Sequence, residues 1–316
     1  MRKLAIIDDY ERAALEAADW SALQQDVAVT VFHDHLAGED ALAERFADFQ
    51  IIVIMRERTP FPRSLLARLP NLELLVTSGM RNASIDLAAA KELGVAVTGT
   101  PILAYPAAEH AWALILALTK RIAIDDQAMR TGGWGTAANA GLKDKTLGIV
   151  GLGRLGSQAA KIGLAFGMRV VAWSENLTDA RCAEVGAERV AKDELFRRSD
   201  VVTIHLQLSE RTRGLVGRRE LELMKPSAYL VNTSRGPIVV EQDLVEALKR
   251  RTIAGAGLDV FDVEPLPADH ALRRLANTVL TPHQGYVTAE NFRLFFSSAV
   301  ENIRAWLDGK IINEVR

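Results

Sequence analysis

Three short polar stretches in the second half of the chain carry one arginine, one carboxylate and one imidazole. They are Asn232-Thr233-Ser234-Arg235-Gly236, Asp259 to Pro265 and Thr281 to Gly285, and they supply Arg235, Glu264 and His283. A guanidinium can grip a carboxylate at two points, an imidazole can take or give the proton of a hydroxyl, and a carboxylate can orient that imidazole. Hydride transfer to or from a 2-oxo or 2-hydroxy acid needs these three groups beside a redox cofactor.

A glycine-rich loop, Gly151-Leu152-Gly153-Arg154-Leu155-Gly156, precedes these stretches. It follows the apolar run Leu147 to Val150 and opens a predicted helix that continues through Phe166. In that context the glycines permit a tight turn, close approach of the backbone to a pyrophosphate, and packing of the helix on the strand. An ordinary glycine-rich turn is the alternative, but the strand and helix around the loop favour a dinucleotide site.

Short runs rich in Val and Ile alternate with helical patterns, which predicts parallel sheets joined by crossover helices. The runs of the first third are Leu4–Ile7, Val27–Phe32, Ile51–Met55, Leu72–Thr77 and Val95–Thr98. A second series comprises Thr146–Val150, Val170–Trp173, Val201–Leu206, Tyr229–Asn232, Ala254–Val260 and Thr278–Leu280. Six strands is the count of a doubly wound dinucleotide-binding domain. The predicted fold class is therefore α/β, with two doubly wound parallel-sheet domains.

The sequence pattern changes near residue 100, where we expect a domain boundary. One apolar helix is predicted over about Ala107 to Ile124, followed by a loop at Thr131 to Gly135. Apolar residues recur at helical spacing from about Thr288 to Leu307, so this last segment should pack on another element.

Composition argues against several classes of partner. Lys and Arg number 38 and Asp and Glu 40, and neither sign forms a block, so nothing indicates binding to nucleic acid or an anionic membrane. The longest apolar stretch, Ala111 to Leu118, is too short to span a bilayer. Cys182 is the only cysteine, and no Cys/His cluster has zinc-ligand spacing. We expect a cytoplasmic protein with no structural metal and a small-molecule partner.

Each candidate residue also has a plainer interpretation when it is taken alone. His283 could be a surface or core histidine, Arg235 a surface residue and Glu264 a solvated acid in a turn. The loop at Ser78 and Gly79 ends a strand and could present amides to an anion, or it could be a plain turn. His205 also ends a strand, and we interpret it as a structural or adenine-side residue rather than as a base.

The ordered set resembles the D-isomer-specific 2-hydroxyacid dehydrogenase family along nearly the whole chain. The matching pieces are Ser78-Gly79 with Ile85-Asp86-Leu87, Ala108-Glu109-His110, the Gly151 to Gly156 loop, Met224-Lys225-Pro226, Asn232 to Gly236, Leu258-Asp259-Val260 with Glu264-Pro265, and Thr281-Pro282-His283. The resemblance implies a Rossmann nucleotide-binding domain, residues 101–285, inserted into a flavodoxin-like substrate-binding domain formed by residues 1–100 and 286–316. It also implies that a helix and arm at about 107–141 form a homodimer.

The resemblance further implies the roles of individual residues. Arg235 would bind the substrate carboxylate and carbonyl, His283 would be the general acid/base, and Glu264 would hydrogen-bond that histidine. The amides of Ser78 and Gly79 would bind substrate. The implied cofactor contacts are Gly151, Gly153, Arg154, Leu155, Gly156, Ser174, His205, Thr233, Asp259 and Gly285, of which Asp259 and Gly285 would hold the carboxamide side of the nicotinamide.

These expectations describe an oxidoreductase that transfers a hydride between a nicotinamide cofactor and a small D-2-hydroxy or 2-oxo acid. NAD is the expected cofactor, and NADP stays open because many family members carry Asp where this chain has Ser174. The alternative function is an NAD(H)-binding regulatory protein, similar to corepressors with this fold. Formate dehydrogenase is disfavoured by Glu264, where that branch looks to use Gln. The sequence leaves open which acid is used, in which direction, and whether Arg56 or Arg58 reaches it.

Overall fold

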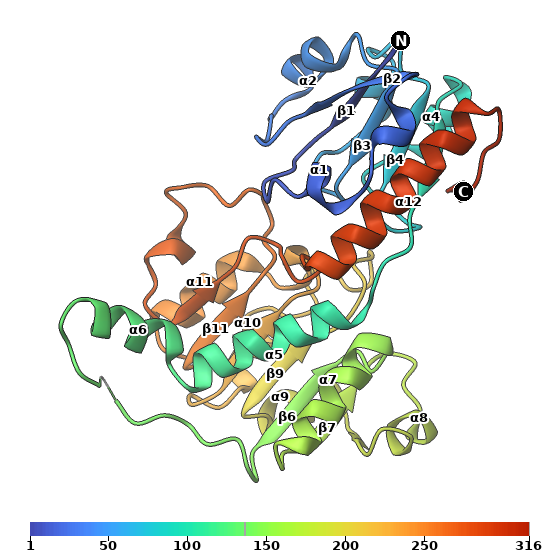
Figure 1. Cartoon of the computed structure of the whole chain (residues 1–316). Coiled ribbons are helices and arrows are strands. Elements are labelled where there is room, and N and C mark those ends of the chain that lie inside the picture. Colours follow the sequence, from blue (N-terminus) through green and yellow to red (C-terminus); the bar gives the residue numbers. More distant parts are fainter. Residues whose placement is uncertain (136, 316) are drawn as a thin grey trace. The chain divides into compact units, whose positions relative to one another are not determined.

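The computed structural model describes residues 1–135 and 137–315 of the chain. They form two compact units, each a parallel sheet covered by helices (Figure 1). Unit 1 comprises Met1–Leu103 and Val287–Arg316, and unit 2 comprises Ala104–Tyr286.

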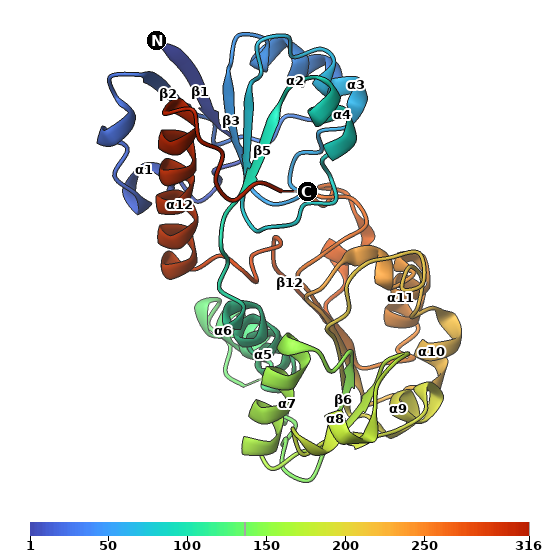
Figure 2. The ribbon, with the colours of Figure 1, turned by 90° about the vertical axis from the view of Figure 1, so that its right-hand side faces the viewer.

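Unit 1 contains a five-stranded parallel sheet with the strand order β2-β1-β3-β4-β5. The strands are β1 (Arg2–Ile6), β2 (Val27–Val31), β3 (Ile51–Ile54), β4 (Leu74–Thr77) and β5 (Ala96–Gly99). The helices are α1 (Ala14–Ala17), the 3-10 helix η1 (Ser21–Leu23), α2 (Glu39–Phe46), α3 (Arg63–Leu66), α4 (Leu87–Glu92) and α12 (Ala289–Leu307). Figure 2 shows α1 and α12 on one side of this sheet and α2, α3 and α4 on the other.

Helix α12 confirms the predicted amphipathic segment at the end of the chain. Its N-cap, Thr288, accepts a hydrogen bond from the Asn291 amide at 3.2 Å, which satisfies one of the free amides of the first turn. The buried face carries Phe292, Phe296 and Ile303, and the helix packs on α1 and β4. This face therefore completes the core of a sheet whose strands lie at the other end of the sequence.

Unit 2 contains a seven-stranded parallel sheet with the order β12-β11-β10-β9-β6-β7-β8. The strands are β6 (Thr146–Val150), β7 (Arg169–Trp173), β8 (Glu188–Arg189), β9 (Val201–Ile204), β10 (Tyr229–Asn232), β11 (Gly255–Leu258) and β12 (Thr278–Leu280). The prediction of six strands missed β8. That strand has two exposed residues, so it carries no apolar pattern, and only its pairing with Val171 and Ala172 makes it a strand.

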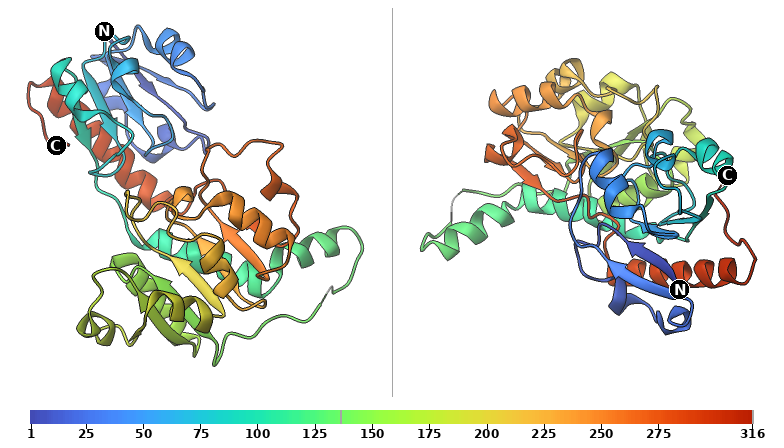
Figure 3. Two further views of the ribbon diagram at one scale, coloured as in Figure 1. Left: turned by 180° about the vertical axis from the view of Figure 1, so that it is seen from behind. Right: turned by 90° about the horizontal axis from the view of Figure 1, so that it is seen from above.

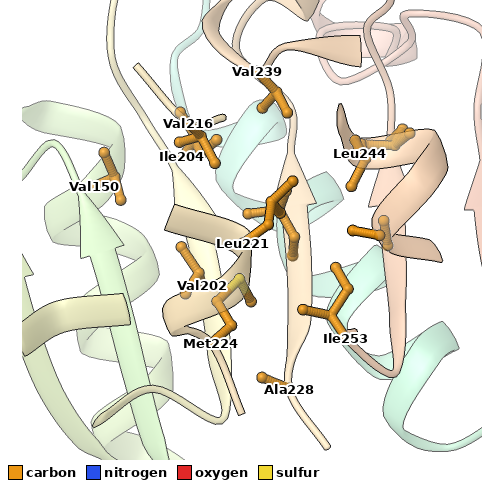
Figure 4. Close-up of a cluster of buried hydrophobic side chains, with 14 of the residues drawn as sticks. Val150, Val202, Ile204, Val216, Leu221, Met224, Ala228, Val239, Leu244 and Ile253 are labelled. Carbon is orange, nitrogen blue, oxygen red and sulfur yellow. The ribbon is translucent and has the colours of Figure 1, made fainter. Parts of the chain in front are cut away.

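Helices cover both faces of this second sheet. They are α5 (Tyr105–Thr119), α6 (Ile122–Arg130), α7 (Arg154–Ala165), α8 (Asp179–Ala183), α9 (Lys192–Arg198), α10 (Arg218–Leu223) and α11 (Glu241–Lys249), with the 3-10 helices η2 (Gly236–Ile238) and η3 (Ala271–Arg274). Successive strand residues face opposite cores: Ile149 packs with the α5 and α7 side, while Val150 packs with Val202, Ile204 and Leu221 (Figure 4). Burial on both faces explains why the strands read as continuous apolar runs.

The single helix predicted over about Ala107 to Ile124 is wrong, because the chain forms two helices there. Helix α5 ends at Thr119, and Arg121 adopts a left-handed backbone with φ +54° before α6 begins. Ile122 and Ile124 continue the apolar pattern in sequence, but they are 55% and 39% exposed, so no packing holds them in the line of α5. Figure 3 shows α6 extending away from the sheet of its own unit. Residue 136 of the predicted arm lies outside the described residues.

No helix among residues 1–135 and 137–315 is both long enough and apolar enough to cross a membrane. The same residues contain no group of three or more His, Cys, Asp or Glu side chains that could hold a metal ion.

Candidate active site

The candidate cofactor and catalytic residues of unit 2 follow the carboxyl ends of parallel strands, so they lie along one edge of one sheet. The glycine-rich loop follows β6, Ser174 follows β7, His205 follows β9, Thr233 to Arg235 follow β10, Asp259 follows β11, and Thr281 to Gly285 follow β12. The strand order reverses between β6 and β9, which is where doubly wound sheets bind their ligands. The nucleotide candidates therefore flank this point, and the catalytic candidates lie on the β10 to β12 side.

The glycine-rich loop has the backbone that a pyrophosphate site requires. Gly151 has φ +100°, and a Cβ atom there would lie 2.8 Å from the His205 carbonyl oxygen. A Cβ on Gly156 would overlap the Gly151 carbonyl oxygen, whereas the space around Gly153 is open to 4 Å. Helix α7 begins at Arg154 and presents its free N-terminal amides at the loop. These features fit the diphosphate of a dinucleotide.

The adenosine side of this site contains few basic groups. Ser174 is half-buried and Glu175 is exposed. The Arg181 guanidinium donates to the Leu152 carbonyl of the glycine-rich loop at 3.4 Å and to the Ser157 hydroxyl of α7 at 2.7 Å. His205 lies 3.0 Å from the Thr203 hydroxyl, and burial lowers the pKa of this imidazole to about 4, so it stays neutral near pH 7. A neutral histidine suits the structural or adenine-side interpretation.

His283 and Glu264 form a short polar contact with each other. Nδ1 of His283 lies 2.6 Å from Oε2 of Glu264, although 19 residues separate them in sequence. The other carboxylate oxygen of Glu264 accepts the Phe261 amide at 2.8 Å, which fixes the plane of the carboxylate. His283 has a left-handed backbone with φ +51°, a conformation that histidine adopts more readily than most non-glycine residues. The pair has the geometry of a histidine oriented by a carboxylate.

The Arg235 backbone is held by the turn that follows β10. The Asn232 side chain donates to the Arg235 carbonyl at 2.9 Å and accepts the Ser234 amide at 3.0 Å. A Cβ on Gly236 would overlap the Phe261 carbonyl, so this glycine lets the two loops lie backbone to backbone. Phe261 also donates its amide to Glu264. The arginine-bearing turn and the loop of the carboxylate are therefore packed together.

Asp259 is 1% exposed and receives several donors at once. Its Oδ1 accepts the Thr281 hydroxyl at 2.5 Å and the Gln284 amide at 2.9 Å, and its Oδ2 accepts the Gly285 amide at 2.8 Å. His110 Nε2 lies 3.2 Å from Oδ1. Burial by itself would raise the pKa of Asp259, but the contact with His110 and the hydrogen bonds from Thr281 and the Gln284 amide outweigh it and lower that pKa. A buried ionised carboxylate thus lies beside the turn of His283.

His110 and Thr281 were not predicted as partners of Asp259. Ala108-Glu109-His110 was among the pieces that match the family. No sequence spacing, however, predicts that a residue of α5 contacts the residue after β12.

Unit 1 carries the substrate-binding candidates at the carboxyl end of β4. Ser78 accepts the Arg56 amide at 2.9 Å, and Gly79 has φ +86°. A Cβ on Gly79 would lie 2.5 Å from Nη1 of Arg56, so this guanidinium packs on the loop. Arg58 is instead held by both oxygens of Glu11, at 2.8 and 3.1 Å. Of the two arginines, Arg56 is the one beside Ser78 and Gly79.

A glycine-rich dinucleotide loop and a histidine–carboxylate pair on one edge of a doubly wound sheet are typical of dinucleotide-dependent dehydrogenases. The sequence of residues 112–285 matches the NAD-binding domain of the D-isomer specific 2-hydroxyacid dehydrogenases. The chain belongs to this family. It is therefore a D-2-hydroxyacid dehydrogenase that uses NAD(H).

Individual relatives support the same assignment. The chain is 42% identical to a glyoxylate reductase of Aeropyrum pernix over an alignment of 257 residues, which covers 78% of this chain and 77% of that protein. A phosphoglycerate oxidoreductase of Vibrio cholerae has a TM-score of 0.93 at 34% identity, covering 98% of this chain and 100% of its own. The D-lactate dehydrogenase of Escherichia coli has a TM-score of 0.83 at 28% identity, covering 99% and 100%. These relatives are named for different hydroxy or oxo acids.

Proposed function

We propose that this enzyme interconverts a small D-2-hydroxy acid and the corresponding 2-oxo acid. In this proposal His283 is the general acid/base, Glu264 orients it, and Arg235 binds the substrate carboxylate. The main support is the 2.6 Å contact between His283 and Glu264 on the sheet edge that also carries the dinucleotide loop.

The tautomer of His283 follows from its partner. An ionised carboxylate only accepts hydrogen bonds, so Nδ1 of His283 carries the proton directed at Glu264, and Nε2 is the atom that exchanges a proton with substrate. NADH, when bound, supplies the hydride. In reduction, Nε2 of the protonated His283 gives its proton to the carbonyl oxygen of the oxo acid, and in oxidation it takes the hydroxyl proton. Arg235 holds the carboxylate and stabilises the negative charge that develops on the neighbouring oxygen.

On the cofactor, we assign the pyrophosphate to the Gly151 to Gly156 loop and the carboxamide side of the nicotinamide to Asp259 and Gly285. The buried, ionised Asp259 can accept one amide N–H, and the Gly285 carbonyl can accept another; the hydrogen bond from the Gly285 amide to Asp259 holds these two groups beside each other. Thr233 follows β10, which lies between β11 and β9 in the sheet, and we assign it to the cofactor as well. Arg154, Leu155, Ser174 and His205 complete the proposed set of cofactor contacts.

On the substrate, we assign the amides of Ser78 and Gly79 to the acid, with Arg56 beside them as a second cation. In this structure the two amides make long hydrogen bonds, to the Ile54 carbonyl at 3.3 Å and the Thr100 hydroxyl at 3.4 Å, which the acid would replace. The support is local. Arg56 packs against Gly79, whereas both nitrogens of the Arg58 fork are taken by Glu11. The Arg56 side chain is 19% exposed. Its Nε lies 3.8 Å from Oε2 of Glu57, which is longer than a hydrogen bond.

We also propose that the enzyme is a homodimer formed through α6 and the following arm. Helix α6 has no buried residue, and Met129 and Trp134 are 52% and 87% exposed. An aromatic and apolar surface of this kind on an extended element is typical of an interface. Sedimentation of the double variant M129S/W134S should show a monomer, and a wild type that sediments as a monomer would contradict the proposal. Cytoplasmic location stays a prediction.

The decisive experiment is reduction of glyoxylate, hydroxypyruvate and pyruvate, followed by NADH absorbance. His283→Asn should lower kcat about 100-fold or more, the usual effect of losing a general acid. His33→Asn is the matched control, because Nδ1 of His33 contacts the carbonyl and the carboxylate of Asp9, which has no assigned role in substrate or cofactor binding. A wild type that binds NADH but turns over none of a broad panel of 2-oxo acids would contradict the proposal and favour the regulatory alternative.

A further inference from the structure

Helix α5 brings a histidine to the carboxylate assigned to the nicotinamide. His110 Nε2 lies 2.8 Å from the Thr281 hydroxyl oxygen and 3.2 Å from Oδ1 of Asp259, across 171 residues of sequence from Thr281. The histidine side chain is 16% exposed, and its Cδ2 would lie 3.7 Å from a Cβ built on Gly285. The imidazole therefore packs against both ends of the turn that carries His283.

The protons of this cluster can be assigned from its donors and acceptors. A hydroxyl has one proton, and the Thr281 hydroxyl gives it to Asp259 over 2.5 Å. The Thr281 oxygen must then accept from His110, so Nε2 of His110 carries a proton. The chain of donors runs from His110 to the Thr281 oxygen and from the Thr281 hydroxyl to Asp259, so it ends on the ionised carboxylate.

The two oxygens of Asp259 are used unequally. A carboxylate oxygen offers about two lone pairs. Those of Oδ1 are taken by Thr281 and the Gln284 amide, with His110 Nε2 close by, whereas Oδ2 accepts the Gly285 amide. The His110 and Thr281 side chains thus fix the orientation of the carboxylate. The second lone pair of Oδ2 can then accept a hydrogen bond from a ligand.

We propose that His110 is a positioning residue: it locks Oδ1 of Asp259 through Thr281, so that Oδ2 remains available to accept the amide N–H of the nicotinamide. This inference rests on the proposed assignment of Asp259 to the nicotinamide. His110 touches neither substrate nor cofactor in this role. Its effect should be confined to ligands that carry the carboxamide, because the pyrophosphate and adenosine contacts lie on the loops after β6, β7 and β9.

Ligand binding measures this effect without turnover. The dissociation constants of NAD⁺, of ADP-ribose, which lacks the nicotinamide, and of 3-acetylpyridine adenine dinucleotide, in which a methyl replaces the amide nitrogen, are measured by calorimetry. The proteins are wild type, His110→Leu, which has no donor, and His110→Gln, whose Nε2 can replace the imidazole donor. Binding of ADP-ribose also reports whether each variant is folded.

In His110→Leu, the Kd for NAD⁺ divided by that for ADP-ribose should rise about tenfold, which corresponds to about 1.4 kcal/mol. His110→Gln should stay within about threefold of wild type, as expected for a restored hydrogen bond. The acetylpyridine analogue should bind wild type and His110→Leu with the same ratio to ADP-ribose, since it has no N–H to lose.

An unchanged NAD⁺ ratio in His110→Leu would overturn the inference, as would equal weakening of all three ligands, which would indicate a purely structural role. Equal loss for NAD⁺ and its acetylpyridine analogue would show that Oδ2 does not bind the amide, and would overturn it too. None of these results changes the test of the proposed function, which is turnover of oxo acids.

Discussion

Glu264→Gln is the most informative single substitution, because the two oxygens of Glu264 have different partners. One accepts Nδ1–H of His283 at 2.6 Å and the other accepts the Phe261 amide at 2.8 Å. Glutamine has the same shape but only one acceptor oxygen, and its NH₂ group is a donor. Whichever way the amide is turned, one of these two N–H groups faces a donor.

The size of the effect follows from what is lost. A hydrogen bond to a charged group contributes about 1.5–3 kcal/mol, and an unsatisfied buried donor costs about 1–3 kcal/mol. The Glu264 side chain is 29% exposed, so water relieves part of this cost. We therefore expect the lower end, about 2 kcal/mol, which corresponds to a roughly 30-fold fall in kcat.

The assay is steady-state reduction of glyoxylate at saturating NADH, with the Kd of NADH measured separately by fluorescence. Glu264→Gln should lower kcat about 30-fold and leave the Kd of NADH within about twofold, since Glu264 is proposed to act only on His283. Glu246→Gln on α11, an exposed carboxylate paired with Lys249, is the control and should behave as wild type. A kcat within about threefold of wild type, or an equal loss in NADH affinity, would refute the reasoning.

Three further outcomes are expected. Arg235→Lys should lower kcat/KM for every active oxo acid by about 100-fold, because a point charge cannot replace a planar fork, and wild-type kcat/KM would remove Arg235 from the substrate site. NADH should be preferred to NADPH about tenfold in kcat/KM, since Glu175 would repel a 2′-phosphate and Arg181 is engaged by Ser157. Burial lowers the pKa of His205 from 6.5 to about 4. As the pH falls, His205 therefore binds a proton at a higher pH in the unfolded chain than in the folded protein, and the free energy of unfolding decreases from pH 6.5 downward. Urea denaturation at pH 8 and 5 should show a loss of roughly 2 kcal/mol that His205→Asn lacks.

The sequence by itself determined the parallel sheets and where the functional loops begin. Apolar runs such as Thr146–Val150 and Tyr229–Asn232 became strands at the predicted residues, because burial on both faces leaves a continuous hydrophobic signal. The glycine-rich loop could also be predicted from the sequence, because all the residues of the motif are consecutive, from Gly151 to Gly156. The apolar pattern did not predict the end of α5. It continues past Arg121, where the helix is already broken, because the apolar residues beyond it are not buried.

Only the tertiary structure decided which side chains meet. Glu264 and His283 were both named from sequence, but their 2.6 Å contact depends on how two separate loops leave β11 and β12. The link from His110 to Thr281 bridges 171 residues. Periodicity reports the backbone conformation and burial of a segment, and it contains no information on the distance between segments. That distance is set by strand register and by how α5 packs on the sheet, which no single stretch of sequence encodes.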